Sequence, residues 1–383
     1  MDQTIKDFEA AIAELESIVK KLEEGDLPLE TSLQLYERGV QLSRFCHTRL
    51  EEAERRIEIL NERGELKPPP ATFGEDEDNT YVDFARYVDA RRAEIEQALA
   101  AALPAPPACP RVVADAMRYS LSAGGKRLRP ILCLASADAV GGPRALAMPA
   151  ACAIELIHTY SLIHDDLPAM DNDTMRRGRP TLHVVAGEAI AILAGDGLLT
   201  EAFRLMARLP ESADPAIAAR KLRAIQVVAE AAGAAGMVGG QALDIAGGAS
   251  ADDPLDDAGG QLRALHSRKT GALIRAAATA GAVMAGADAP AVGGIDAAAA
   301  EFGLAFQIVD DVLDIEGAPA TLGKTAGKDA ASGKRTYASL YGIEGARCMA
   351  ADCLERAERT LRSAGLADSA LMDIGRWIVN RSN

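Results

Sequence analysis

The stretch IHDDLPAMDND, residues 163–173, places four aspartates within nine positions, directly after an apolar run. The chain already carries a formal charge of −15, so a further group of carboxylates at one point adds electrostatic repulsion. His158 and Asp165 are seven residues apart, which places both on one face of a helix. Pro168 disfavours continuation of that helix, so we expect a turn that brings Asp171 back toward Asp165.

A second acidic cluster follows in FQIVDDVLD, residues 306–314. Asp310 and Asp314 are spaced i and i+4 on one helix face, beside Asp311. A hard cation removes the repulsion between clustered carboxylates, and Mg²⁺ is commonly shared between carboxylates and substrate phosphates. Two such clusters facing each other are therefore expected to bind a phosphate group through bridging Mg²⁺ ions.

Basic residues accompany both acidic clusters, and Lys and Arg bind phosphate oxygens directly. They occur in GGKRLRP (residues 124–130), in RRGRP as Arg176 and Arg177, and as Lys269, Lys324 and Lys334. The runs SLI, AILAGDGLLT, GALIRAAATAGAV and FGLAFQIV are expected to line a long apolar pocket. The pattern therefore predicts an amphiphilic substrate, a diphosphate attached to a hydrocarbon.

Length and composition limit the remaining possibilities. The 383 residues suggest two domains, and the combination of 49% hydrophobic with only 4% aromatic residues favours an all-α fold. No run of 18 or more apolar residues and no export signal is evident, so we expect a cytoplasmic protein without a membrane span, with its six cysteines reduced. A pI near 4.9 argues against direct nucleic-acid binding.

A change in composition marks a domain boundary. Residues 67–80 combine three prolines with four acidic residues and lack apolar periodicity, which predicts a linker. Before it, residues 1–66 read as two antiparallel helices with apolar stripes that need a covering partner. Residues 81–383 read as helix after helix and would form the second domain.

The first segment resembles a known family. The sequence of residues 7–60, including LEEGDLPLE and YERGVQL, is similar to the small subunit of bacterial exodeoxyribonuclease VII. The resemblance implies a non-catalytic helical hairpin that binds the large nuclease subunit. A generic coiled-coil hairpin used for self-association is the alternative.

Residues 81–383 resemble the trans-isoprenyl diphosphate synthases, in particular the bacterial farnesyl diphosphate synthases. GGKRLRP, SLIHDDLPAMDND, RRG, GQALD, HSRKTGALI, FQIVDDVLD and LGKTAGKDAASGKRTY occur in that family's order. The resemblance implies a helical bundle around a deep central cavity, a homodimer, and three Mg²⁺ ions as cofactors. The chain would then be a fusion of two families.

The resemblance also assigns roles to individual residues. The metal ligands would be Asp165, Asp166 and Asp171 together with Asp310, Asp311 and Asp314. Arg176, Lys269 and Lys324 would bind the allylic diphosphate, with Lys334 in the same binding region. Lys126, Arg129, His158 and Arg177 would bind the diphosphate of isopentenyl diphosphate, and Gly125 would also be a substrate-binding residue. Thr270, Gln307 and carbonyl groups near Lys269 would stabilise the allylic cation, and the departing pyrophosphate would accept the final proton.

Product length is expected to depend on Tyr160 and Ser161, just before the first aspartate cluster. In the resembling family an aromatic residue at the position of Tyr160 limits growth to fifteen carbons, which predicts farnesyl diphosphate. Alternatives are a geranylgeranyl diphosphate synthase, a terpene cyclase, a metal phosphohydrolase built on His164 and Asp165, or a chain that acts chiefly as a nuclease partner. The motif DDVLD favours chain elongation over cyclisation.

Overall fold

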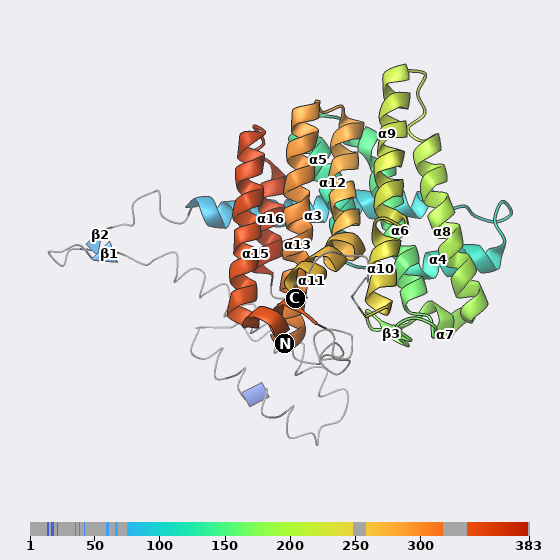
Figure 1. Cartoon of the computed structure of the whole chain (residues 1–383), viewed down its shortest axis with the longest axis horizontal. Helices are drawn as coiled ribbons and strands as arrows, with labels where there is room; N and C mark the ends of the chain where they lie inside the picture. Colours follow the sequence, from blue (N-terminus) through green and yellow to red (C-terminus); the bar gives the residue numbers. More distant parts are fainter. Residues whose placement is uncertain are drawn as a thin grey trace. The chain divides into compact units, whose positions relative to one another are not determined.

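Residues 272–285, ALIRAAATAGAVMA, carry small or apolar side chains on nearly every face, as expected for a helix buried on all sides. In the computed structural model of the protein they form α12 (Ala272–Ala285), whose residues from Ala276 to Met284 are all buried. Four neighbouring helices pack on α12: α5 (Leu128–Ala139), α6 (Arg144–Asp165), α9 (Pro215–Ala232) and α13 (Ala289–Glu316). Figure 1 shows α12 among them. The run expected to line a substrate pocket is therefore largely packed core.

The structure describes residues 84–247, 258–316 and 335–381 with their side chains, the backbone of residues 75–83, and only isolated positions before residue 75. It divides the chain into two units, Met1–Val82 and Asp83–Asn383. The remaining helices of the second unit are α3 (Glu75–Ala102, which begins in the first unit), α4 (Arg111–Leu121), α7 (Leu182–Ala186), α8 (Glu188–Arg208), α10 (Met237–Ile245), α11 (Ala258–His266), the π-helix η1 (Ser267–Gly271), α15 (Tyr337–Ser363) and α16 (Ala370–Asn380).

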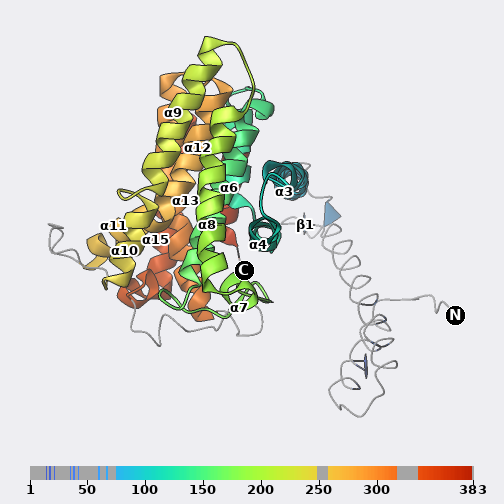
Figure 2. The same ribbon diagram turned by 90° about the vertical axis from the view of Figure 1, so that its right-hand side faces the viewer.

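The long helices of the second unit run roughly alongside one another, whereas α3 and α4 cross them (Figures 1 and 2). The described part of this unit contains one small sheet, in which β3 (Met175–Arg176) pairs antiparallel with β4 (Arg179–Pro180). The all-α prediction is confirmed for this part of the chain.

Two core helices, α6 and α13, are long and apolar enough to span a membrane by length and composition. Their most apolar windows are, however, 72% and 56% buried within the protein. Burial against other helices accounts for this apolar character, because a core helix meets the same criterion.

The first unit is described at a few positions only. Ile18 and Leu42 are buried, and Arg38 Nε lies 2.8 Å from Glu14 Oε1, which joins the two segments expected to form the hairpin. Leu15 and Val40, which belong to the apolar stripes of the two predicted helices, lie outside the described residues.

Two predicted boundaries need correction. Residues expected to close the second hairpin helix instead form β1 (Ile59–Leu60), which pairs antiparallel with β2 (Leu66–Lys67). Asparagine and glycine between these strands disfavour a continuous helix. The predicted linker, residues 67–80, also ends early because α3 begins at Glu75. Its acidic residues suit the first turn of a helix, where the macrodipole favours negative charge.

Candidate active site

The first aspartate cluster lies at the carboxyl end of α6. The helix ends at Asp165, and the Asp171 backbone N–H donates to the Asp165 carbonyl at 2.8 Å, so the expected turn after Pro168 is present. Burial raises the pKa of Asp165 to about 6; Lys269 opposes this effect, while Asp171 and Asp166 add to it. Asp165 is therefore a half-buried carboxylate that lies close to two further carboxylates and to the cations Lys269 and Arg176.

Asp166 is paired with an arginine from the β3–β4 hairpin. Arg176 donates to Asp166 Oδ1 from Nη2 at 2.7 Å and from Nε at 2.8 Å. The Asp166 side chain is only 6% exposed and that of Arg176 16%. The predicted metal ligand and the predicted diphosphate-binding arginine thus lie in direct contact. A small cavity of about 40 Å³ borders both residues, with Leu162 and Ile163 of the SLI run in its wall.

The second cluster lies near the carboxyl end of α13, with Asp310 and Asp314 one helical turn apart. Arg381 Nη2 donates to Asp310 Oδ1 at 2.7 Å. Asp311 is buried, and its two oxygens accept hydrogen bonds from Gln307 Nε2 at 3.0 Å and from the Tyr337 backbone N–H at 2.8 Å. Asp311 therefore links α13 to α15, and its expected role as a metal ligand stays a prediction.

Three predicted catalytic residues come together at η1. Thr270 Oγ1 donates to Gln307 Oε1 at 3.1 Å, so the two groups expected beside the allylic cation are in contact. Lys269 Nζ lies 2.6 Å from Asp244 Oδ2 on α10. A Cβ atom at Gly240 would lie 2.3 Å from the Lys269 backbone nitrogen. The glycine that begins GQALD therefore permits α10 to pack on this turn. π-helical turns are frequently found at functional sites.

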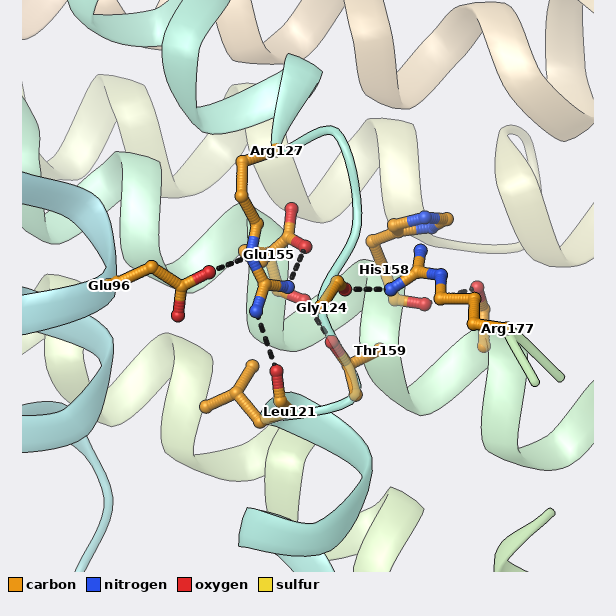
Figure 3. A network of polar contacts seen from close by, with 9 residues as sticks. Glu96, Leu121, Gly124, Arg127, Glu155, His158, Thr159 and Arg177 are labelled. Atoms are coloured by element: carbon orange, nitrogen blue, oxygen red, sulfur yellow. Dashed lines mark hydrogen bonds and ion pairs between the residues drawn. The ribbon is translucent and has the colours of Figure 1, made fainter. Parts of the chain in front are cut away.

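The basic loop before α5 packs directly against Arg177. Arg177 Nη1 donates to the Gly124 carbonyl (Figure 3). A Cβ at Gly125 would lie 2.6 Å from the same nitrogen. Gly125 also has φ +131°, a conformation that side chains disfavour. In this structure Gly125 thus allows the close approach of Arg177.

Arg127 has a different role from its neighbours in GGKRLRP. It donates from Nη1 to Glu155 at 2.6 Å, from Nε to Glu96 at 2.7 Å and from Nη2 to the Leu121 carbonyl at 2.6 Å (Figure 3). Its side chain is 1% exposed. These bonds tie the loop to α3, α4 and α6, so the arginine's charge is neutralised within the fold.

His158 lies in a strongly positive environment. Burial lowers its pKa well below the ordinary value, and the charges of Arg129, Arg177, Arg176 and Arg127 lower it further. Burial also lowers the pKa of Arg129, opposed by Glu155 and Asp310. Arg129 Nε is buried and has no hydrogen-bond partner among the described residues. A concentration of guanidinium groups that includes a buried donor without a partner is suited to an anion that carries several oxygens.

Lys126, from the same basic loop, lies near α16. Its Nζ is 5.8 Å from the centre of the Trp377 ring. Burial lowers the pKa of Lys126, Arg381 lowers it further, and Asp310 opposes the change. Lys126 is therefore close to the second aspartate cluster. Lys324 and Lys334 lie outside the described residues.

The residues expected to control product length lie on α6 below the first cluster. Tyr160 is 7% exposed, and its ring meets the His164 ring edge to face at 5.7 Å between centroids. Burial raises the pKa of Tyr160, and the charge of Asp165 adds to the effect, as expected for a phenol near that carboxylate. Ser161 Oγ donates to the His158 carbonyl at 2.9 Å, a bond within the helix.

The donor set of both clusters suits Mg²⁺, because it consists of carboxylate oxygens. Among the described residues, no three carboxylate, histidine or cysteine side chains are grouped closely enough to hold an ion by themselves. Asp166 and Asp310 each accept a guanidinium hydrogen bond instead. The residues of both clusters therefore fit an ion that is also held by substrate phosphate oxygens. Such an ion would neutralise carboxylates that are paired with arginines in this structure.

Sequence reasoning missed Arg381. It follows α16, 71 residues after Asp310 in the sequence, and no motif marks it. Asp244 was noted only as part of GQALD, and its contact with Lys269 assigns it to the site.

Comparisons with known proteins agree with this geometry. The family model described as polyprenyl synthetase matches residues 110–365, and the model described as exonuclease VII small subunit matches residues 8–59. A farnesyl diphosphate synthase of Geobacillus stearothermophilus is 47% identical over 274 residues, which cover 72% of this chain and 90% of that protein. A geranylgeranyl diphosphate synthase of Cyanophora paradoxa is 42% identical over 79% of this chain and 98% of that protein.

Solved structures give the same result. The apo crystal structure of an FPP/GFPP synthase from Zymomonas mobilis matches with a TM-score of 0.66 and 37% identity, covering 78% of this chain and 99% of that one. A geranyltransferase from Legionella pneumophila matches with a TM-score of 0.65 and 32% identity, over 81% of this chain and 99% of that one. The chain is a prenyltransferase that belongs to the polyprenyl synthetase family, joined at its amino-terminal end to an exonuclease VII small-subunit segment.

Proposed function

We propose that the protein condenses an allylic diphosphate, dimethylallyl or geranyl, with isopentenyl diphosphate and makes mainly farnesyl diphosphate. The observation that carries this proposal is the convergence of four arginine charges on His158, close to Asp166 of the first aspartate cluster and Asp310 of the second. Relatives at 47% and 42% identity are named for the farnesyl and geranylgeranyl products. Geranylgeranyl diphosphate is therefore the second candidate product.

The two diphosphates would bind at different places. Arg176 and Lys269, with Lys324, would bind the allylic diphosphate beside Asp165, Asp166 and Asp171. Lys126, Arg129, His158 and Arg177 would bind the diphosphate of isopentenyl diphosphate, near Asp310. Neutral His158 would donate or accept a hydrogen bond without adding charge, because burial and four arginines oppose its protonation.

The reaction would begin when the bond between the allylic carbon and the diphosphate oxygen breaks, leaving an allylic cation and pyrophosphate. Mg²⁺, which we propose as three ions, would neutralise the leaving group. The Thr270 hydroxyl and Gln307 amide, 3.1 Å apart, would present oxygen dipoles to the cation. The double bond of isopentenyl diphosphate would attack that cation, and pyrophosphate would accept the proton then lost.

Product analysis tests this proposal. The purified protein is incubated with Mg²⁺, isopentenyl diphosphate and either allylic substrate, and the dephosphorylated products are separated by chromatography. A fifteen-carbon alcohol is expected from both substrates. A twenty-carbon main product would select the second candidate, and the absence of any condensation product would overturn the proposal.

We further propose that the synthase unit forms a homodimer in the cytoplasm. The support is a group of exposed apolar side chains on adjoining helices: Val112 of α4, Val184 and Val185 of α7, and Ile192 and Leu193 of α8. Water-exposed apolar groups of this kind favour a protein interface. Light scattering is expected to give twice the chain mass for the natural protein and a single chain for the variant Leu193→Asp. A natural protein that is monomeric at micromolar concentration would contradict the proposal.

The amino-terminal segment would bind an exonuclease VII large subunit without nuclease activity of its own. The support is the family match over residues 8–59. Pull-down with a purified large subunit is expected to recover it with the natural chain and to fail with Leu15→Asp or Val40→Asp. Equal recovery with all three proteins would exclude the apolar stripe as the interface.

A further inference from the structure

The end of α16 places a buried cation against the second aspartate cluster. Arg381 Nη2 donates both to Asp310 Oδ1 and to the Phe306 carbonyl, each at 2.7 Å. Its guanidinium carbon also lies 3.9 Å from the centre of the Phe306 ring. The Arg381 side chain is 2% exposed, whereas that of Asp310 is 43% exposed. Arginine thus covers one side of a carboxylate that remains partly exposed.

This arrangement holds the arginine firmly in place. The carbonyl of Phe306 and the face of its ring both stabilise a guanidinium. A cavity of about 220 Å³ adjoins Arg381. It is lined mainly by aliphatic side chains of α13, α15 and α16. This cavity provides space for the Arg381 side chain to shift once its bond to Asp310 is lost, because its volume exceeds that of several water molecules.

The same helix reaches the basic loop. Trp377 lies one turn before Arg381, and Lys126 Nζ is 5.8 Å from its ring. Lys126 and Arg381 also act on each other electrostatically, with Asp310 as the opposite charge. A change in the charge at Asp310 therefore changes the electrostatic energy of both Arg381 and Lys126.

Binding of a divalent cation at Asp310 would change this balance. The ion and the guanidinium would both be positive and would both require the carboxylate, so the ion weakens the arginine's hydrogen bond. The arginine retains the Phe306 carbonyl and ring, and can turn its other donors toward a phosphate oxygen that arrives with the ion.

We propose that Arg381 is a positioning residue that holds Asp310 until a divalent cation and a diphosphate arrive, and then gives up the carboxylate to the cation. This inference rests on the proposed function, because it assumes that Asp310 binds a metal ion during the reaction. It predicts that the arginine competes with Mg²⁺ for Asp310. Removing the arginine should therefore lower the Mg²⁺ concentration needed to occupy the site.

Trp377 provides a direct measurement, since it is the only tryptophan in the chain. The full-length protein is mixed with a fixed excess of pyrophosphate, and its tryptophan fluorescence is followed as MgCl₂ is added, with no prenyl substrate present. The natural protein is expected to show a saturable change in emission. In Arg381→Gln the midpoint should fall about threefold to tenfold, which corresponds to roughly 0.7–1.4 kcal/mol.

Arg376→Gln is the matched control. Arg376 lies on α16, five residues before Arg381, but it pairs with Glu358 at 3.2 Å and its side chain is 45% exposed. Its loss should therefore leave the midpoint of the Mg²⁺ titration unchanged. Arg381→Lys keeps the positive charge, so its midpoint should be close to that of the natural protein. This variant also keeps the inference testable if Arg381→Gln folds poorly. Circular dichroism melting confirms folding of each variant.

An unchanged or raised midpoint in Arg381→Gln would overturn the inference, as would an equal fall in Arg376→Gln. Product analysis of the natural protein separates this result from failure of the proposed function. If prenyl transfer occurs but the midpoints agree, only the role of Arg381 is wrong. If the midpoint falls as expected but no prenyl product forms, the competition is supported and the proposed reaction is wrong.

Discussion

The ammonium group of Lys269 lies 2.6 Å from the carboxylate of Asp244, joining the π-helical turn η1 to α10. Their side chains are 28% and 14% exposed. Because a lysine side chain has four flexible bonds, this ion pair fixes the direction of a charge that would bind the allylic diphosphate.

Replacing Asp244 by asparagine should therefore affect the reaction more than the fold. The amide can still accept a hydrogen bond but no longer attracts the ammonium charge, so we expect kcat to fall about tenfold and the KM for geranyl diphosphate to rise. Steady-state kinetics measure both values. Asp296→Asn, which weakens the exposed pair with Arg275, is the control and should change neither. Equal kinetic effects in the two variants would show that Lys269 does not depend on Asp244.

Lys126→Ala should discriminate between the two substrates. Lys126 lies near Trp377 and within the electrostatic influence of Asp310, whereas Arg176 pairs with Asp166 of the first cluster. We expect the KM for isopentenyl diphosphate to rise about tenfold and that for geranyl diphosphate much less. Lys221→Ala serves as the control, because Lys221 is a half-buried lysine of α9 that donates to the Pro210 carbonyl at 3.2 Å. Equal rises in both KM values would contradict the assignment of Lys126.

Protonation of His158 should make the fold less stable in mild acid. Its pKa in the folded protein lies below the ordinary value of 6.5, so the unfolded chain binds a proton more readily. The stabilisation is fully present above pH 6.5 and is lost as the pH falls below it, by up to about 1.4 kcal/mol per pH unit.

Chemical denaturation followed by Trp377 fluorescence checks this effect. Between pH 7.5 and 5.5 the unfolding free energy of the natural protein should fall more steeply than that of His158→Asn, which cannot be protonated in this range. Other groups titrate equally in both proteins and cancel in the difference. Parallel curves would mean that His158 accepts a proton without cost in the folded state.

Tyr160→Ala should lengthen the product. The ring is buried below Asp165 and against His164, where a chain extending from the first cluster would meet it. We expect a shift from fifteen-carbon toward longer products, with a stability loss of roughly 3–5 kcal/mol from the cavity. Tyr160→Phe keeps the ring and should keep the product. A folded, active alanine variant that still stops at fifteen carbons would exclude Tyr160 as the limit.

Cutting the chain between residues 68 and 74 should leave prenyl transfer unchanged. This site lies before Glu75, where α3 begins, so the cut leaves that helix intact. A specific protease site inserted there allows the activity of the same preparation to be compared before and after cleavage. Loss of activity in a folded fragment would show that the first 67 residues contribute to catalysis.

Much of this protein could be predicted from sequence because its signals are local. The small apolar residues of α12 specify a buried helix, and Pro168 after Asp165 specifies the turn that returns Asp171. The spacing of Asp310 and Asp314 likewise follows from helical geometry. The order of the motifs was sufficient to identify the family.

Contacts between distant segments could not be predicted in this way. Asp311 looks like its neighbour Asp310, but it faces Gln307 and the start of α15, whereas Asp310 faces Arg381. Arg127 resembles Arg129 in sequence, yet only the fold shows that Glu96 and Glu155 neutralise Arg127 while Arg129 Nε has no partner among the described residues. The sequence by itself determined the helices, the family and the chemical types of the site residues, because these depend on neighbours along the chain. Only the tertiary structure decided which charge meets which, because an ion pair depends on the distance between helices that lie far apart in sequence.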